Sequence, residues 1–146
     1  MKKTILATIA FVALSLYSFA GGKNEDRKLL SDLQTALKTS THVQWSTKTD
    51  YTQASFGFNG KAVSAFYSPE DNSLIGFSIH LDMKDLPKEI TDAVNQKYGD
   101  WTIVDAILFI DSNAAANYFA QVTKGKNNLA LKIVNGKAII YGRMPS

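Results

Sequence analysis

Two histidines, His42 and His80, are the first residues to consider for catalysis, because a serine nucleophile would need such a base beside it. Neither histidine has a serine or a carboxylate at a recognisable spacing, and the chain has no G-x-S-x-G sequence to expose a nucleophile. The chain also lacks cysteine, which excludes thiol chemistry. Both histidines are therefore interpreted as solvated residues of predicted strands or strand edges. An enzyme that uses His80 with a nearby carboxylate is the alternative hypothesis.

Four aspartates flank the second predicted helix: Asp82 and Asp85 precede it, and Asp100 and Asp105 follow it. A carboxylate pair could support glycoside or calcium chemistry, but no D-x-D-x-D-G loop is present, and helix capping explains the residues more simply. No H-E-x-x-H sequence or phosphate-binding glycine loop occurs. The sequence predicts no metal, no cofactor and no enzymatic activity.

Apolar side chains occupy both faces of a predicted strand over Thr102–Asp111. Val104, Ala106, Leu108 and Ile110 can face the helices, which leaves alternate residues for the opposite face. The expected result is an apolar and aromatic patch on the open side of the sheet, available to a partner. Its candidate partner-binding residues are Ile103, Ile107, Phe109, Phe119 and Tyr141. The alternative is that loops, the N-terminal leader or the curvature of the sheet cover them.

The first twenty residues have the pattern of a secretory signal peptide. Lys2 and Lys3 precede an uncharged stretch, and Ser18 and Ala20 stand at the −3 and −1 positions of a cut before Gly21. The apolar stretch is short for a membrane-spanning helix, which needs about 20 residues. We therefore expect residues 1–20 to be removed after Ala20 and the product to be periplasmic or secreted, without a membrane association.

Cleavage changes the charge of the chain. The full sequence has 16 basic and 13 acidic residues, a net charge of +3, and loss of Lys2 and Lys3 lowers the net charge to +1. The remaining basic residues are scattered among carboxylates rather than gathered on one segment. A nucleic-acid partner is therefore not expected.

The elements that must position these residues follow from periodicity. Leu29, Leu33 and Leu37 define one stripe of a helix that begins at Asn24, and a second helix begins at Pro87 and ends before Gly99. Period-two alternation and turn residues predict eight strands, over residues 43–45, 52–58, 61–68, 73–81, 102–111, 117–123, 128–134 and 137–143. Asn59 and Gly60 predict a type I′ hairpin turn.

The predicted order is a helix and four strands, twice. The sequence FNGKA at residues 58–62 recurs as VNGKA at 134–138, although chance explains this phrase about as well as common ancestry does. The fold class expected is α+β, with two tandem units over residues 24–82 and 86–144, each a helix on a four-stranded antiparallel sheet.

These features together resemble the PepSY-like, beta-lactamase-inhibitor-like proteins exported by Gram-negative bacteria. The resemblance covers most of residues 45–143, and Gly99-Asp100 stands where relatives often have Pro-Gly. Its segments are Phe58-Asn59-Gly60-Lys61, Ala65-Phe66-Tyr67, Leu86-Pro87 with Ile90, Val94 and Tyr98, and Trp101-Thr102-Ile103. The resemblance implies two tandem α/β units, no catalytic residues, and a periplasmic binding or inhibitory role toward an unnamed partner.

The first function hypothesis is therefore a non-enzymatic exported module that binds a protein or peptide. The alternative hypothesis is a carrier that holds a small molecule or peptide between the two units. Its cavity would be lined by Trp45, Tyr67 or Trp101.

Overall fold

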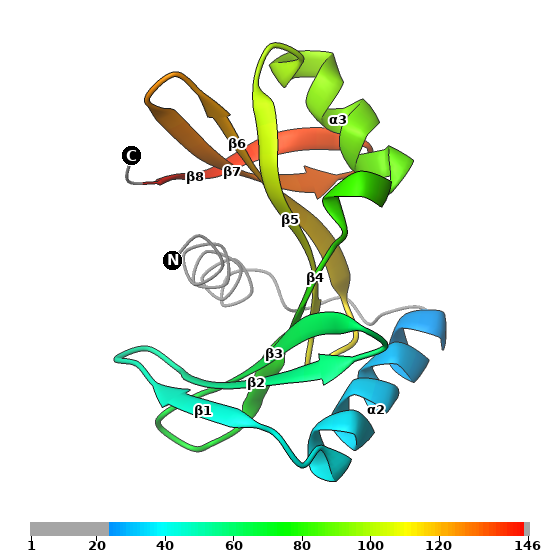
Figure 1. Cartoon of the computed structure of the whole chain (residues 1–146), viewed down its shortest axis with the longest axis vertical. Coiled ribbons are helices and arrows are strands. Elements are labelled where there is room, and N and C mark those ends of the chain that lie inside the picture. Colours follow the sequence, from blue (N-terminus) through cyan, green and yellow to red (C-terminus); the bar gives the residue numbers. More distant parts are fainter. Residues whose placement is uncertain (1–23, 145–146) are drawn as a thin grey trace. The chain divides into compact units, whose positions relative to one another are not determined.

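The computed structural model describes residues 24–144, so the predicted signal peptide lies outside the described residues. Within them the chain forms two α-helices, one 3₁₀ turn and a single eight-stranded sheet in which each strand lies beside the next in sequence, from β1 to β8 (Figure 1). The elements are α2 (Asn24–Thr39), β1 (Gln44–Thr47), β2 (Thr52–Phe58), β3 (Lys61–Tyr67), β4 (Leu74–His80), η1 (Met83–Asp85), α3 (Lys88–Tyr98), β5 (Thr102–Asp111), β6 (Ala116–Lys124), β7 (Asn127–Val134) and β8 (Lys137–Met144). The α+β class and the predicted element order are confirmed.

The described residues divide into two compact units. Residues 24–79 and 109–116 form the first, which we call the α2 unit, and residues 80–108 and 117–144 form the second, the α3 unit. The division runs through β5, whose last three residues belong to the α2 unit. Each unit is described separately below.

The α2 unit buries apolar side chains on both faces of its strands. Helix α2 contributes Leu33, and acidic residues in its first turn and Lys38 in its last turn complement the helix dipole. On one strand face Phe56 meets Phe77 edge-on, with ring centroids 6.2 Å apart. On the other face Phe66 contacts Phe109, and both side chains are fully buried. This unit therefore has aromatic packing on both sides of its strands.

The turn between β2 and β3 has the predicted type I′ form. Asn59 and Gly60 have φ values of 51° and 76°, and Phe58 pairs with Lys61 across the turn. The turn between β7 and β8 repeats this geometry at Asn135 and Gly136, with φ values of 51° and 75°. Positive φ at both central residues is what this turn requires, and asparagine and glycine tolerate it best.

The α3 unit is built around the predicted stripe of its helix. Ile90, Ala93, Val94 and Tyr98 are all buried, and α3 ends at Tyr98 as the glycine after it predicts. Gly99 itself has a right-handed φ of −63°, so the helix ends without a left-handed cap. The strand residues of the same core cluster are Ala106, Ala120, Val122, Leu129, Leu131, Ile133 and Ala138.

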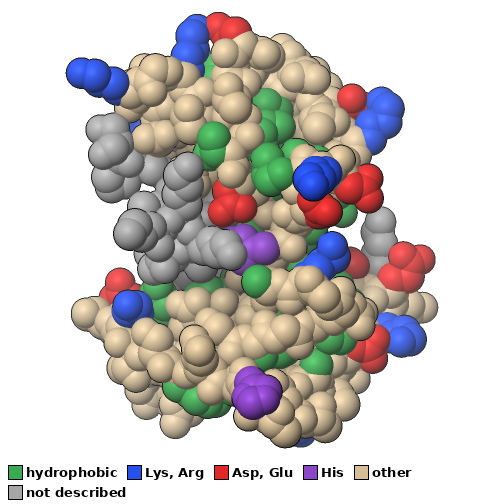
Figure 2. Space-filling view, in the orientation of Figure 1, with side chains coloured by type: hydrophobic (Ala, Val, Ile, Leu, Met, Phe, Trp, Pro, Cys, Tyr) green, Lys and Arg blue, Asp and Glu red, His purple; other side chains and the backbone are tan. Residues whose placement is uncertain are grey.

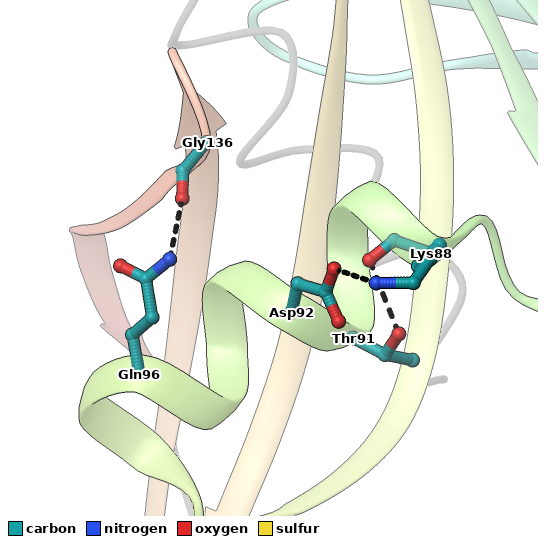
Figure 3. Close-up of polar contacts among 5 residues, drawn as sticks. All are labelled: Lys88, Thr91, Asp92, Gln96 and Gly136. Carbon is teal, nitrogen blue, oxygen red and sulfur yellow. Dashed lines mark hydrogen bonds and ion pairs between the residues drawn. The ribbon is translucent and has the colours of Figure 1, made fainter.

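Polar contacts occur near both ends of α3 (Figure 3). Lys88 pairs with Asp92 one turn later, and the Thr91 hydroxyl donates to the Lys88 carbonyl at 3.2 Å. At the other end, the Gln96 amide donates to the Gly136 carbonyl at 3.4 Å, in the β7–β8 turn. The helix is thereby attached to the tip of that hairpin.

Asp71 shapes the turn between β3 and β4. Its Oδ1 accepts hydrogen bonds from the Ser73 hydroxyl at 2.7 Å and from the Ser73 backbone N–H at 3.0 Å. These bonds favour the carboxylate and hold the pKa of Asp71 below its ordinary value, with the Ser73 side chain as the largest cause. The folded state therefore binds this proton less readily than the unfolded chain does.

This shift predicts a pH-dependent contribution of Asp71 to stability. The contribution is fully present above the unfolded-state pKa and is lost as pH falls through the folded-state pKa. We expect wild type to exceed Asp71→Asn slightly in unfolding free energy at neutral pH, with the difference vanishing in acid. Urea unfolding across a pH series measures this difference. Glu70→Gln is the control, and an identical pH profile for both variants would refute the assignment.

Candidate functional site

The strands of the α3 unit have a second face, opposite the helix. Because side chains alternate along a strand, the neighbours of the core residues Leu81, Ala106 and Ala120 point away from α3. We call this the far face. Its residues are His80, Asp105, Ile107, Phe119, Gln121 and Tyr141.

The side chains of His80 and Asp105 lie together on the far face. The last residue of β4 and the middle of β5 are brought together by a backbone hydrogen bond from Leu81 N–H to the Ala106 carbonyl, 3.0 Å long. The distance from His80 Nδ1 to Asp105 Oδ1 is 3.5 Å, and the two side chains are only 13% and 14% exposed. Asp105 Oδ1 also accepts from the Ala106 N–H at 2.9 Å. The carboxylate hypothesised near His80 is thus Asp105.

Gln121 Oε1 on the far face is buried and accepts no hydrogen bond from any described residue, whereas His80 Nδ1 faces Asp105 Oδ1 at 3.5 Å. Gln121 is 5% exposed and lies on β6 between Ala120 and Val122, which both face α3. Leaving a buried acceptor unsatisfied costs about 1–3 kcal/mol. The far face therefore has unfilled hydrogen-bonding capacity beside apolar side chains.

The predicted site residues lie in three places: on the far face, in the α2 unit and against the core around α3. Phe119 and Tyr141 lie together on the far face, with ring centroids 5.7 Å apart at 82°, and Ile107 belongs to the same face. Phe109 belongs to the α2 unit. Ile107, Phe109 and Phe119 are buried, while Ile103 and Tyr141 are partly exposed. The alternative interpretation, that these side chains are covered, accounts for the three buried ones.

Ile103 is the predicted site residue that contacts the core around α3. Strict alternation along β5 places it opposite Ala106, but Ile103 packs with Trp101 against the α3 core cluster. Ile103 therefore contributes to the core around α3.

The aromatic residues proposed to line a carrier cavity lie in different units. Trp45 is 61% exposed on β1, and its ring centroid is 6.0 Å from that of Tyr67. Burial raises the pKa of Tyr67. Trp101 instead belongs to the α3 unit and meets Tyr98 edge-on at 6.0 Å. Trp101 thus contributes to the core around α3.

The flanking aspartates have separate structural roles. Asp82 Oδ1 accepts the Lys84 N–H at 2.9 Å and caps η1, as the capping interpretation predicts. Asp100 pairs with Lys124, and this hydrogen bond lowers the pKa of Asp100. Within residues 24–144 no three His, Asp or Glu side chains come together in a way that could hold a metal ion.

Sequence reasoning missed Gln121, although the signal was available. Tyr118, Ala120 and Val122 define one face of β6, and alternation then assigns Gln121 to the other face with Phe119. The pairing of His80 with Asp105 had no such signal, because it depends on which strands become neighbours.

On the described part of the surface in Figure 2, cationic and anionic side chains are interspersed.

No family model and no curated protein matches the chain. Solved structures do match it. A protein from Bacteroides eggerthii described as periplasmic aligns with a TM-score of 0.62 and 14% identity over 86% of this chain and 89% of its own. A BLIP-like protein from Bacteroides fragilis aligns with a TM-score of 0.59 and 15% identity over 86% of this chain and 87% of its own. A DUF2874 family protein from Bacteroides uniformis aligns with a TM-score of 0.61 and 12% identity over 84% of this chain and 88% of its own.

The chain has a BLIP-like fold. At these identities the likeness establishes the arrangement of helices and strands, and most of both chains takes part in it. The resemblance to beta-lactamase-inhibitor-like proteins, first drawn from short sequence segments, is thereby confirmed at the level of the fold. Neither α2 nor α3 of this BLIP-like chain is long and apolar enough to span a membrane.

Proposed function

We propose that the chain is an exported, non-enzymatic binding module that holds a protein or peptide partner on the far face of the α3 unit. The observation that carries the proposal is Gln121 Oε1, a buried acceptor without a donor among the described residues, on the same strand face as the rings of Phe119 and Tyr141. The likeness to a protein described as periplasmic and the signal-like pattern of residues 1–20 support export.

The far face has the composition of an interaction surface. Interface hot spots combine aromatic anchors with polar groups that are shielded from water, and the partly exposed ring of Tyr141, which packs on the buried ring of Phe119, provides such an anchor here. A partner that donates a hydrogen bond to Gln121 Oε1 would remove the cost of leaving this acceptor unsatisfied. Because the residues are on β-strands, they would be positioned before binding.

We also propose that the chain consists of two related helix-plus-four-strand units. Each helix is followed by four consecutive strands, and the two Asn-Gly turns have nearly identical φ values. The hairpins occupy different places in the two halves, between the second and third strands in one and between the third and fourth in the other.

A capture experiment with paired variants tests the binding role. Protein exported by a Gram-negative host and purified from its periplasm is immobilised and exposed to periplasmic extract. The test variant Gln121→Leu/Tyr141→Phe removes polar atoms from the far face with little change of shape. The control Gln96→Leu/Tyr118→Phe makes the same two changes elsewhere in the unit. We expect the test variant to retain its fold and lose about tenfold or more of the captured partner, as truncated hot spots do.

Two results would contradict the binding role. The first is capture of the same partner equally by both variants. The second is native mass spectrometry that finds a small molecule bound stoichiometrically to the purified protein, because that result favours the carrier hypothesis.

A further inference from the structure

The edge strand β8 exposes two consecutive isoleucines. Ile139 is 51% exposed and Ile140 is 48% exposed, and consecutive residues on a strand point to opposite faces. β8 stands last in the strand order, and within residues 24–144 it pairs with β7 alone. Its outer backbone N–H and C=O groups therefore pair with no other described strand, and large apolar side chains flank them on both faces.

A groove of about 550 Å³ lies between this strand and α3. Its apolar lining includes Tyr98, Ala138, Ile139 and Ile140, and its charged lining consists of two lysines, Lys97 and Lys137, without an acidic residue. Neither lysine takes part in an ion pair within the described residues. The bond from Gln96 to Gly136 attaches α3 to the β7–β8 turn and holds the two sides of the groove together.

We propose that β8 and this groove bind an extended acidic peptide segment of a partner protein, which adds a ninth strand to the sheet. Main-chain hydrogen bonds to an exposed strand edge supply affinity in such complexes, and pockets for alternate side chains supply specificity. Apolar side chains of the segment would pack on Ile140 and Tyr98, and its carboxylates would pair with Lys97 and Lys137. The groove lies on the α3 side of β8, and this proposal does not depend on the function proposed above.

A second copy of the chain fits the same edge poorly. The charged residues of β8 are Lys137 and Arg143, both basic. Antiparallel pairing of β8 with its own copy would set basic residues against basic residues, and like charges opposite each other destabilise a sheet. Charged edge residues also protect a sheet from self-association, but the exposed isoleucines work against such protection. An acidic partner strand with apolar side chains would match both the basic residues and the exposed isoleucines of β8.

The test is a nuclear magnetic resonance titration with a defined probe. The probe is a blocked peptide of four Val-Glu repeats, its matched control has lysine in place of glutamate, and a third peptide carries a central proline that interrupts strand pairing. We expect the glutamate peptide alone to shift the β8 amide signals and to slow their hydrogen exchange. Equal binding of the lysine peptide, or unaltered β8 amides at saturation, would overturn the proposal.

Charge reversal then locates the site. Lys97→Glu/Lys137→Glu is expected to weaken binding of the glutamate peptide about tenfold, because two attractive contacts become repulsive. Lys61→Glu/Lys126→Glu makes the same charge change at exposed lysines outside the groove and is expected to alter binding less than about twofold. If both variants lost the same affinity for the glutamate peptide, the effect would come from the net charge of the protein and the groove would not be the binding site. A dimer that forms through β8 at working concentration would assign the edge to self-association instead.

Discussion

Replacing Phe109 by alanine is expected to lower the free energy of unfolding by about 3–5 kcal/mol, the range for a buried phenylalanine. The side chain is fully buried, its ring lies 6.1 Å from that of Phe66, and it fills the space beside Gly76. The neighbours cannot collapse into the gap without moving a second aromatic ring. Such a loss is a large part of the 5–15 kcal/mol that typically stabilises a domain.

Urea unfolding of Phe109→Ala beside Ile139→Ala measures this effect. Ile139 is a large apolar residue that is half exposed, so its truncation is expected to cost less than about 1 kcal/mol. If Phe109→Ala folds with nearly wild-type stability while partner capture is lost, Phe109 is a contact residue, as the sequence pattern indicates. A large loss of stability assigns it to the core of the α2 unit.

Gly76→Ala is expected to destabilise the protein by about 3 kcal/mol or more, at the upper end of the costs of overpacking. A Cβ at this position would lie 2.5 Å from the Ile110 carbonyl oxygen and 2.6 Å from the Phe109 ring. A ring can rotate, but a backbone oxygen within a strand cannot move without distorting the sheet. This glycine therefore allows a close approach of side chain and backbone within the α2 unit.

Gly57→Ala is the matched control, since Gly57 also lies within a strand but has no atom closer than 4.0 Å to the added Cβ. We expect this variant to gain about 0.5 kcal/mol, because alanine loses less conformational freedom on folding. The double variant Gly76→Ala/Phe109→Ala removes the ring contact and leaves the contact with the Ile110 oxygen. If the double variant were as stable as Phe109→Ala alone, the contact between the added Cβ and the Ile110 oxygen would have no cost, and this explanation of the effect of Gly76→Ala would be contradicted.

The regular elements could be predicted because local patterns determine them. The stripe Ile90, Ala93, Val94 and Tyr98 is the buried side of α3, and the Asn59-Gly60 pair forms the turn that its φ requirement predicts. These features depend on residues a few positions apart, which a linear sequence displays directly.

The candidate site could be predicted only in part, because its properties depend on distant contacts. Alternation assigned Ile107 and Phe119 to one face, but nothing local indicated that they are buried or that His80 lies beside Asp105. The packing of Ile103 against the α3 core cluster is likewise a contact between distant residues that alternation along β5 does not indicate. The open edge of β8 depends on strand order, which the sequence pattern did not determine.

The division within β5 has a consequence for biosynthesis. Phe109, Ile110 and Asp111 belong to the unit whose other strands end at residue 79, so the α2 unit acquires its last core residues only after α3 and most of β5 have been made. A nascent chain that stops at residue 82 contains Phe66 without the ring that packs against it. We expect the first four strands to remain incompletely folded until the whole of β5 has been made.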